Sequence, residues 1–197
     1  MFIELAESLR CPVPHEETHL VLATGSMKAR CITFGTLGCP TCKGEYPIAN
    51  GIVTFGAPPV VPASPAALPD AGVVQALLGL ASPGGYVVLV GSAGGLAEPL
   101  AQLLPGVHFA VVNLVGISGT SMVRSLLVST ETIPLRTVAR GAVLGAEYAG
   151  APWLPEAARV VLRGQRVLVL TESVERVPTQ LAPMAAGRGM WVGRKTG

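Results

Sequence analysis

The chain has 197 residues, of which half are apolar and 13% are charged, and its net charge is +2. This length allows one ordinary domain or a small domain followed by a medium one, and the apolar content excludes a disordered protein. The weak positive charge disfavours a dedicated nucleic-acid-binding protein, because such proteins usually carry a strongly basic face.

The long apolar segment between Asp70 and Arg124 contains a single charged residue, Glu98. Glycine and proline interrupt this segment repeatedly, so no apolar run reaches the ~18 residues of a membrane-spanning helix. The start of the chain, MFIELAESLR, carries two glutamates and lacks the basic and apolar regions of a signal peptide. We therefore expect a cytoplasmic protein that does not span a membrane.

The composition divides the chain into three parts. Residues 1–56 contain all four cysteines and two of the three histidines. Residues 57–69, APPVVPASPAALP, contain five prolines and no charge, which is typical of a semi-rigid linker. Residues 70–197 alternate short apolar runs with helical stretches. The sequence therefore predicts a small metal-binding domain, a linker and a larger α/β domain.

Two copies of a Leu-x-Cys-Pro pattern lie in the first part of the chain, LRCP and later LGCP. The second copy belongs to a Cys-x-x-Cys turn formed by Cys39 and Cys42. In the first copy, the position three residues after Cys11 is Pro14, which cannot bind a metal. His15 follows directly and has a side chain long enough to take that place.

The predicted ligands form a closed Cys3His set: Cys11, His15, Cys39 and Cys42. Four protein ligands around Zn²⁺ leave no position for a catalytic water, so we expect a structural site. Three alternatives stay open: His19 in place of His15, Cys31 in place of either ligand of the first turn, or no metal. We expect Cys31 to be a small buried residue and His19 to lie on the surface.

The segment CPTCKGEYPIANGIVTF resembles the second half of the small zinc-ribbon family that activates tRNA, rRNA and release-factor methyltransferases. The hallmark of that family is a Cys-x-x-Cys turn followed by Tyr-Pro-Ile-x-x-Gly-Ile. The matching residues are Tyr46, Pro47, Ile48, Gly51 and Ile52. The first turn departs from the family, because His15 stands where a cysteine is usual. The resemblance implies a zinc ribbon that covers apolar surface on a methyltransferase.

The third part of the chain predicts a parallel sheet with helices on both faces, a compact Rossmann-like fold. The predicted strands are 86–91, 108–116, 125–130, 141–148, 165–172 and 189–195, and the predicted helices are about 70–81, 95–104, 118–124 and 153–163. The strands are rich in valine and leucine, and each ends near glycine or polar residues.

The stretch YVVLVGSAGGLAEPLAQLLPGVHFAVVNL resembles the opening of a class I S-adenosylmethionine-dependent methyltransferase, and the later strands follow in the order of that family. The resemblance implies cofactor contacts at the glycine-rich turn and at the ends of the second and third strands. The corresponding residues are Gly91, Ser92, Ala93, Gly95, Asn113 and Ser129.

The departures from the methyltransferase pattern concern those same positions. Ala93 replaces a glycine of the usual turn, and Asn113 and Ser129 stand where the family usually has acidic residues that bind the ribose and the adenine. A charge-assisted hydrogen bond is worth ~1.5 to 3 kcal/mol, so losing several would weaken binding ~100-fold or more. We expect S-adenosylmethionine to bind weakly or not at all.

Candidates for contact with a substrate lie after the fourth strand, at Glu147 and Tyr148, and no residue has an assigned catalytic role. We expect Trp153 to lie in the core or at an interface, His108 on the surface, and Glu131 to be a solvated loop carboxylate.

Two functions follow from the two resemblances. One is a small, degenerate S-adenosylmethionine-dependent methyltransferase with a structural zinc ribbon, acting on RNA or protein. The other is a non-catalytic methyltransferase-like scaffold or partner-binding subunit. An enzyme predicts an open pocket at the glycine-rich turn, whereas a scaffold predicts a pocket filled by side chains. The high apolar content favours a homo-oligomer or a protein partner, and the missing Gly-x-Gly-x-x-Gly pattern disfavours a dinucleotide-dependent oxidoreductase.

Overall fold

The structure, a computed structural model, describes residues 1–61, 67–116, 119 and 121–197. The strands in the first part of the chain are β1 (Val21–Lys28), β2 (Cys31–Gly38), β3 (Glu45–Ala49) and β4 (Ile52–Thr54). Those in the second part are β5 (Tyr86–Val90), β6 (His108–Val112), β7 (Arg124–Val128), β8 (Ala139–Leu144), β9 (Val161–Val169), β10 (Leu181–Gly187) and β11 (Met190–Lys195). The helices are α1 (Ala71–Leu78), α2 (Ala97–Leu103) and α3 (Trp153–Val160), with short 3₁₀ helices η1 (Ile3–Ser8), η2 (Gly91–Leu96) and η3 (Ala146–Tyr148).

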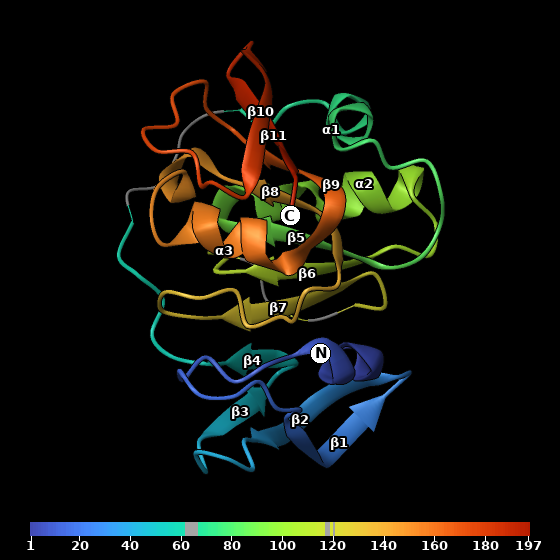
Figure 1. The fold of residues 1–197 in the computed structure, drawn as a ribbon. Helices are drawn as coiled ribbons and strands as arrows, with labels where there is room; N and C mark the ends of the chain where they lie inside the picture. Colours follow the sequence, from blue (N-terminus) through green and yellow to red (C-terminus); the bar gives the residue numbers. More distant parts are fainter. Residues whose placement is uncertain (62–66, 117–118, 120) are drawn as a thin grey trace.

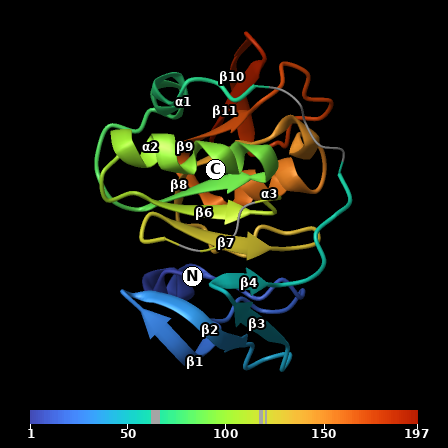
Figure 2. The same cartoon turned by 180° about the vertical axis from the view of Figure 1, so that it is seen from behind.

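All eleven of these strands belong to one sheet, in the order β1-β2-β3-β4-β7-β6-β5-β8-β9-β11-β10 (Figure 1). Strands β5 to β9 are parallel, and β11 runs antiparallel to both β9 and β10. Helix α3 covers one face of the parallel strands, and α1 and α2 cover the other (Figures 1 and 2). The predicted α/β class and the Rossmann-like arrangement are thereby confirmed.

The central strands are apolar along their whole length because both faces are covered. Every residue of β6 is buried, as are the last four residues of β5. In β5, Val88 and Val90 belong to the core beneath α3, whereas Val87 and Leu89 belong to the core beneath α1 and α2. Strands in such a position lose the alternation of apolar and polar residues that an exposed strand shows.

The first part of the chain forms hairpins that extend this sheet. Strands β1 to β4 pair antiparallel in chain order, and β4 then pairs parallel to β7, with Ile52 opposite Leu126. The backbone N–H of Phe55 continues the pairing by donating to the carbonyl of Val128 at 2.8 Å. The strands of residues 1–56, a segment that we call the ribbon after the resemblance described above, therefore cover the edge of the Rossmann-like sheet at β7.

His108 lies at the junction between the two parts, and our expectation that it is a surface residue was wrong. It is 5% exposed, and its ring stacks on Phe2 with 4.8 Å between ring centroids. Its Nδ1 donates to the carbonyl of Met122 at 3.1 Å, so Nε2 accepts from the hydroxyl of Ser125 at 2.9 Å. The Ser125 hydroxyl in turn accepts from the backbone N–H of Phe2. Burial lowers the pKa of His108 to about 4.

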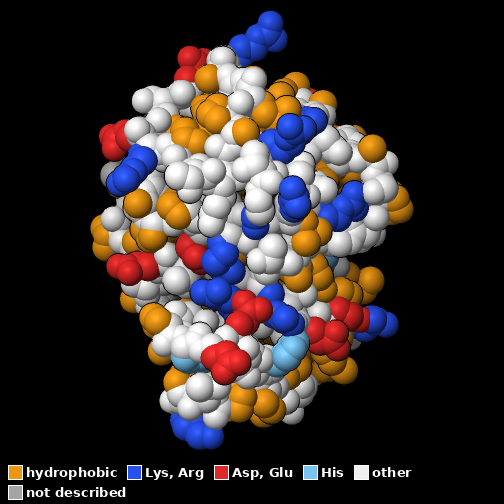
Figure 3. Space-filling view, in the orientation of Figure 1, with side chains coloured by type: hydrophobic (Ala, Val, Ile, Leu, Met, Phe, Trp, Pro, Cys, Tyr) orange, Lys and Arg blue, Asp and Glu red, His pale blue; other side chains and the backbone are white. Residues whose placement is uncertain are grey.

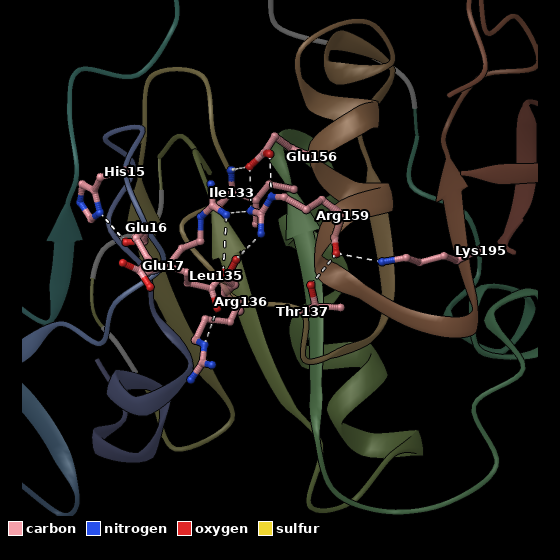
Figure 4. Close-up of polar contacts among 11 residues, drawn as sticks. His15, Glu16, Glu17, Ile133, Leu135, Arg136, Thr137, Glu156, Arg159 and Lys195 are labelled. Atoms are coloured by element: carbon pink, nitrogen blue, oxygen red, sulfur yellow. Dashed lines mark hydrogen bonds and ion pairs between the residues drawn. The ribbon is translucent and has the colours of Figure 1, made fainter. Parts of the chain in front are cut away.

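A second polar network holds the segment after β7 against α3 and the ribbon (Figure 4). The guanidinium of Arg159 donates to the Glu156 carboxylate and to the carbonyls of Ile133 and Leu135, at 2.7 to 2.8 Å. On the ribbon side, Arg136 donates from Nε to Glu17 at 2.8 Å. Acidic and basic side chains alternate on the surface over this junction (Figure 3).

The predicted elements differ from the observed ones at several boundaries, and the strands predicted at 108–116 and 165–172 are observed at His108–Val112 and Val161–Val169. Residues 118 and 120 of the helix expected at 118–124 lie outside the described residues, residues 119 and 121–123 are not helical, and Arg124 already belongs to β7. The predicted helix at 153–163 ends at Val160, because the chain turns directly into β9 at Val161. The strand expected at 141–148 ends at Leu144, and its last residues form η3. Strand β10 was not predicted.

No helix among the described residues is both long enough and apolar enough to cross a membrane.

Candidate functional site

The four predicted metal ligands come together at one end of the ribbon. The thiols of Cys11, Cys39 and Cys42 and a ring nitrogen of His15 all lie within 4.8 Å of one another. The Cys11 and Cys42 sulfurs are 3.6 Å apart, and the Cys39 sulfur is 3.3 Å from Nε2 of His15. A tetrahedral ion with Zn–S bonds of about 2.3 Å separates its sulfur ligands by about 3.7 Å, so this donor set fits zinc.

The turn between β2 and β3 positions two of the ligands. The backbone N–H of Cys39 donates to the carbonyl of Gly44 at 2.8 Å, and the N–H of Lys43 donates to the carbonyl of Cys39 at 3.0 Å. Lys43 takes a left-handed conformation with φ of 63°, which closes the turn. This tight loop makes Cys39 and Cys42 point the same way.

The surroundings change the acidity of the ligands. Burial alone would raise the pKa of the Cys39 thiol, but hydrogen bonds from the backbone of Cys42 and Thr41 and from neighbouring thiols outweigh burial and lower it to about 6. Burial raises the pKa of the Cys11 thiol. A hydrogen bond to the carbonyl of Glu16 raises the pKa of His15. A thiolate is the form that binds a metal, so Cys39 is ready for ligation at neutral pH.

Tyr46 contacts the cluster through Cys11. Its hydroxyl lies 3.0 Å from the Cys11 sulfur, and its ring packs on Phe55 with 4.8 Å between centroids. Tyr46 is one of the residues that match the ribbon hallmark, but its contact with Cys11 could not be read from the spacing.

The two alternative ligands lie outside this cluster. Cys31 is buried in β2, where its backbone bridges to Phe2. His19 lies beside Arg136, with 3.1 Å between its Nε2 and Nη1 of that arginine. Among the described residues, neither belongs to the group that could hold an ion.

The glycine-rich turn follows β5 at the carboxyl end of the parallel strands, and side chains from the loop after β8 fill the space above it. The Glu147 carboxylate accepts from the backbone N–H of Ser92 at 2.6 Å and from its hydroxyl at 3.0 Å. A Cβ placed on Gly91 would lie 2.4 Å from the Tyr148 ring and 2.4 Å from the Glu147 carboxylate. Tyr148 is 2% exposed and packs edge-on against Trp153, which is also buried.

The polar groups expected to meet the cofactor are bonded to each other. The side-chain amide of Asn113 donates to the carbonyl of Ser129 at 2.8 Å, and its oxygen accepts from the N–H of Ser129 at 2.9 Å. Both residues are buried. This reciprocal pair ties the end of β6 to the end of β7.

Two cavities lie near these residues, and neither joins them into one pocket. A cavity of about 360 Å³ reaches Ser92 but includes none of the other predicted cofactor residues. A cavity of about 280 Å³ reaches Ser129 and lies between the loop 12–14 and the segment 129–132. Glu131 lines this second cavity. The predicted cofactor residues therefore lie near the carboxyl ends of β5, β6 and β7, and neither of these two cavities joins them. Within the glycine-rich turn, Glu147 and Tyr148 contact the start, at Gly91 and Ser92.

No protein-family profile and no curated protein matches the chain. Several solved structures are similar to it. One is the complex between the Haloferax volcanii Trm112 methyltransferase activator and a candidate methyltransferase, with 17% identity and a TM-score of 0.39 over 49% of this chain and 50% of that chain. The chain thus spans about half the length of that protein.

Two further similar structures are methyltransferases. The antibiotic-resistance methyltransferase Kmr is 15% identical, with a TM-score of 0.45 over 68% of this chain and 97% of its own. The tRNA (m1A58) methyltransferase TrmI from Aquifex aeolicus is 13% identical, with a TM-score of 0.44 over 66% of this chain and 70% of its own. At these values the Rossmann-like assignment rests on the strand order, and no activity is carried over from these proteins.

Proposed function

We propose that the chain is a zinc ribbon fused to a methyltransferase-like domain that does not bind S-adenosylmethionine and acts as a binding subunit. The observation that carries this proposal is the position of Tyr148 and Glu147 against Gly91. Of the two functions expected from the sequence, this arrangement favours the non-catalytic one, in which side chains fill the cofactor region.

The physical argument concerns what a cofactor would displace. In the family that the second part resembles, glycines let the cofactor approach the backbone at the end of the first strand. In this chain the Tyr148 ring packs directly against Gly91. Removing a buried aromatic ring from its packing costs about 3–5 kcal/mol. The hydroxyl and N–H of Ser92 already bind the Glu147 carboxylate. The side-chain amide of Asn113 is bonded to the backbone of Ser129, and it lacks the carboxylate that binds the ribose in that family.

The ribbon has a structural role in the same proposal. Cys11, His15, Cys39 and Cys42 would hold one Zn²⁺, which would stabilise a small module that has little core of its own. The module covers the edge of the second part through β4, in keeping with its resemblance to methyltransferase activators. We infer that the partner of the whole chain is a protein or a second copy, and that RNA is the less favoured partner, given the net charge of +2.

The test is isothermal titration calorimetry of zinc-loaded protein with S-adenosylmethionine and S-adenosylhomocysteine. We expect no binding heat at ligand concentrations up to about 1 mM, which corresponds to less than about 4 kcal/mol of binding free energy. Circular dichroism on the same sample shows that the protein is folded. Micromolar binding to the unmodified protein would overturn the proposal.

A pair of variants tests whether the side chains of Glu147 and Tyr148 are what prevents S-adenosylmethionine from binding. The double variant Glu147→Ala with Tyr148→Ala opens the space over Gly91, and Glu175→Ala serves as a control at an exposed carboxylate. Weak S-adenosylmethionine binding in the double variant alone would support the proposal directly.

A further inference from the structure

One cavity lies at the carboxyl ends of three neighbouring strands, β5, β8 and β9. Its volume is about 360 Å³, and Ser92, Ala146 and Leu170 contribute from the segments that follow β5, β8 and β9. The strand order reverses direction between β5 and β8. Parallel α/β sheets bind ligands in the crevice at such a reversal, and a volume at the low end of 300–1,000 Å³ suits a small molecule.

Two residues of opposite charge line the cavity, Glu172 after β9 and Arg188 at the tip of the β10–β11 hairpin. Glu172 accepts from the backbone N–H of Gly189 at 2.6 Å, which anchors the tip of the hairpin to the end of β9. This bond also fixes the backbone of Arg188, which directly precedes Gly189 in the chain. Within the described part of the chain, Arg188 forms no ion pair, with Glu172 or with any other carboxylate.

The hairpin turn presents Arg188 in an unusual conformation. Arg188 and Gly189 both have positive φ, 54° and 75°, as in a two-residue turn of type I′. The first position of such a turn favours asparagine, aspartate or glycine. An arginine in the left-handed region is disfavoured, and this turn places Arg188 beside the cavity.

The rest of the wall is largely apolar. Leu68, Leu170 and Met190 line it, and the end of the linker, 67–69, closes one side. Leu68 is held there because its side chain packs against Gly95, where an added Cβ would come within 2.6 Å. The described parts of the linker run alongside the carboxyl ends of the strands (Figures 1 and 2).

We propose that this cavity binds a small zwitterion, a free α-amino acid with an apolar side chain. Arg188 pairs with its carboxylate, Glu172 with its ammonium group, and the side chain lies on Leu68, Leu170 and Met190. Glu172 and Arg188 have opposite charges beside an apolar wall, and within the described part of the chain neither forms an ion pair, although Glu172 accepts from the N–H of Gly189. A zwitterion complements both charges, whereas a simple ion would pair with only one of them and a purely apolar ligand with neither. The inference goes beyond the proposed function, because it concerns a neighbouring site and a different ligand.

The experiment is calorimetric titration of the zinc-loaded protein with three matched probes: L-leucine, L-leucinamide, which lacks the carboxylate, and 4-methylpentanoate, which lacks the ammonium group. We expect L-leucine to bind with a dissociation constant below about 1 mM, and each analogue to bind at least about tenfold more weakly. Equal binding of all three probes, or no binding of L-leucine, would overturn the proposal.

Two variants assign the charges. Glu172→Gln keeps an acceptor for the N–H of Gly189 and should remove the advantage of L-leucine over 4-methylpentanoate. Arg188→Gln should make L-leucine bind no more tightly than L-leucinamide. Arg194→Gln, at an exposed arginine of the same hairpin, should leave the affinities for all three probes unchanged. Unchanged L-leucine affinity in both Glu172→Gln and Arg188→Gln would overturn the assignment.

S-adenosylmethionine, itself an amino acid zwitterion, is titrated in parallel to separate the two proposals. L-leucine binding without S-adenosylmethionine binding supports both. No binding of either ligand overturns the zwitterion site and leaves the proposed function standing. S-adenosylmethionine binding that requires Glu172 and Arg188 overturns the proposed function but supports the cavity as a zwitterion site.

Discussion

The metal-ligand cluster and the glycine-rich turn were both singled out by short motifs, yet their side chains behave in opposite ways. In the cluster, four donor atoms converge within 4.8 Å, although thiols gain little from contact with one another. At the turn, each polar group has found a partner in the chain, Ser92 with Glu147 and Asn113 with Ser129. A sequence motif therefore predicts which residues lie close together. Whether they need a ligand depends on the hydrogen bonds that their atoms already make within the protein.

The largest expected effect concerns the cluster. Cys39→Ser removes a ligand whose lowered pKa favours the thiolate, and structural zinc contributes on the order of 10 kcal/mol to small domains, so we expect the ribbon to lose zinc and unfold. Elemental analysis should fall from one zinc per chain to nearly none, and near-ultraviolet circular dichroism should lose the signal of Tyr46.

The controls for this prediction are the two alternative ligands. Cys31→Ser and His19→Ala should keep one zinc per chain, whereas His15→Ala should lose it. Loss of zinc in Cys31→Ser, with retention in His15→Ala, would show that the wrong ligands were assigned.

The next effect tests whether the turn is closed. Tyr148→Ala should cost about 3–5 kcal/mol, and Gly91→Ala about 3 kcal/mol, because the new methyl group meets the Tyr148 ring. In the Tyr148→Ala background the clash with the ring is gone and only that with the Glu147 carboxylate remains, so Gly91→Ala should cost at least about 1 kcal/mol less than in the unmodified protein. Urea unfolding of the four proteins measures the coupling, and simple additivity would mean that the ring does not fill this space.

A somewhat smaller effect comes from His108, another polar group that is satisfied inside the protein. Its folded pKa of about 4 lies below the usual value of about 6.5, so the folded state keeps the ring neutral. As the pH falls through 6.5 the unfolded chain takes up a proton that the folded chain does not, and stability should fall by about 2 kcal/mol between pH 7.5 and 5. His108→Gln should remove this part of the pH dependence in urea titrations. An identical pH dependence in the variant would refute the assignment.

The smallest effect is that of the carboxylate above the turn. Glu147→Gln weakens two hydrogen bonds to Ser92 and should cost about 1–2 kcal/mol in urea unfolding, because bonds to charged groups exceed those to neutral ones. Glu175→Gln, at an exposed position, should change stability by less than about 0.5 kcal/mol. A neutral result at Glu147 would mean that the carboxylate does not hold the turn.

The sequence was most informative where a single local rule decides the structure. The parallel strands were predictable because they are covered on both faces. The Cys3His cluster was predictable because the spacing of its residues places them on two turns. Strand β10 was missed because LAPMAAG contains proline and glycine and lies at an exposed edge of the sheet. The closure of the turn could not be predicted, since it depends on where Glu147 and Tyr148 point, 55 or more residues beyond Ser92. The burial of His108 likewise depends on the distant Phe2 and Ser125.

The parallel pairing of β4 with β7 has a consequence for how the chain is made. Ile52 and Leu126 are partners but are separated by 74 residues, 52 to 126. During synthesis the ribbon therefore leaves the ribosome with β4 paired only to β3, and the other edge of β4 stays unpaired until β7 has been translated. Contacts between such distant residues slow folding, and an unpaired strand can pair with another chain. Rapid metal binding by the nascent ribbon would order β3 and β4 early and so reduce incorrect pairing of the free edge of β4 with other chains.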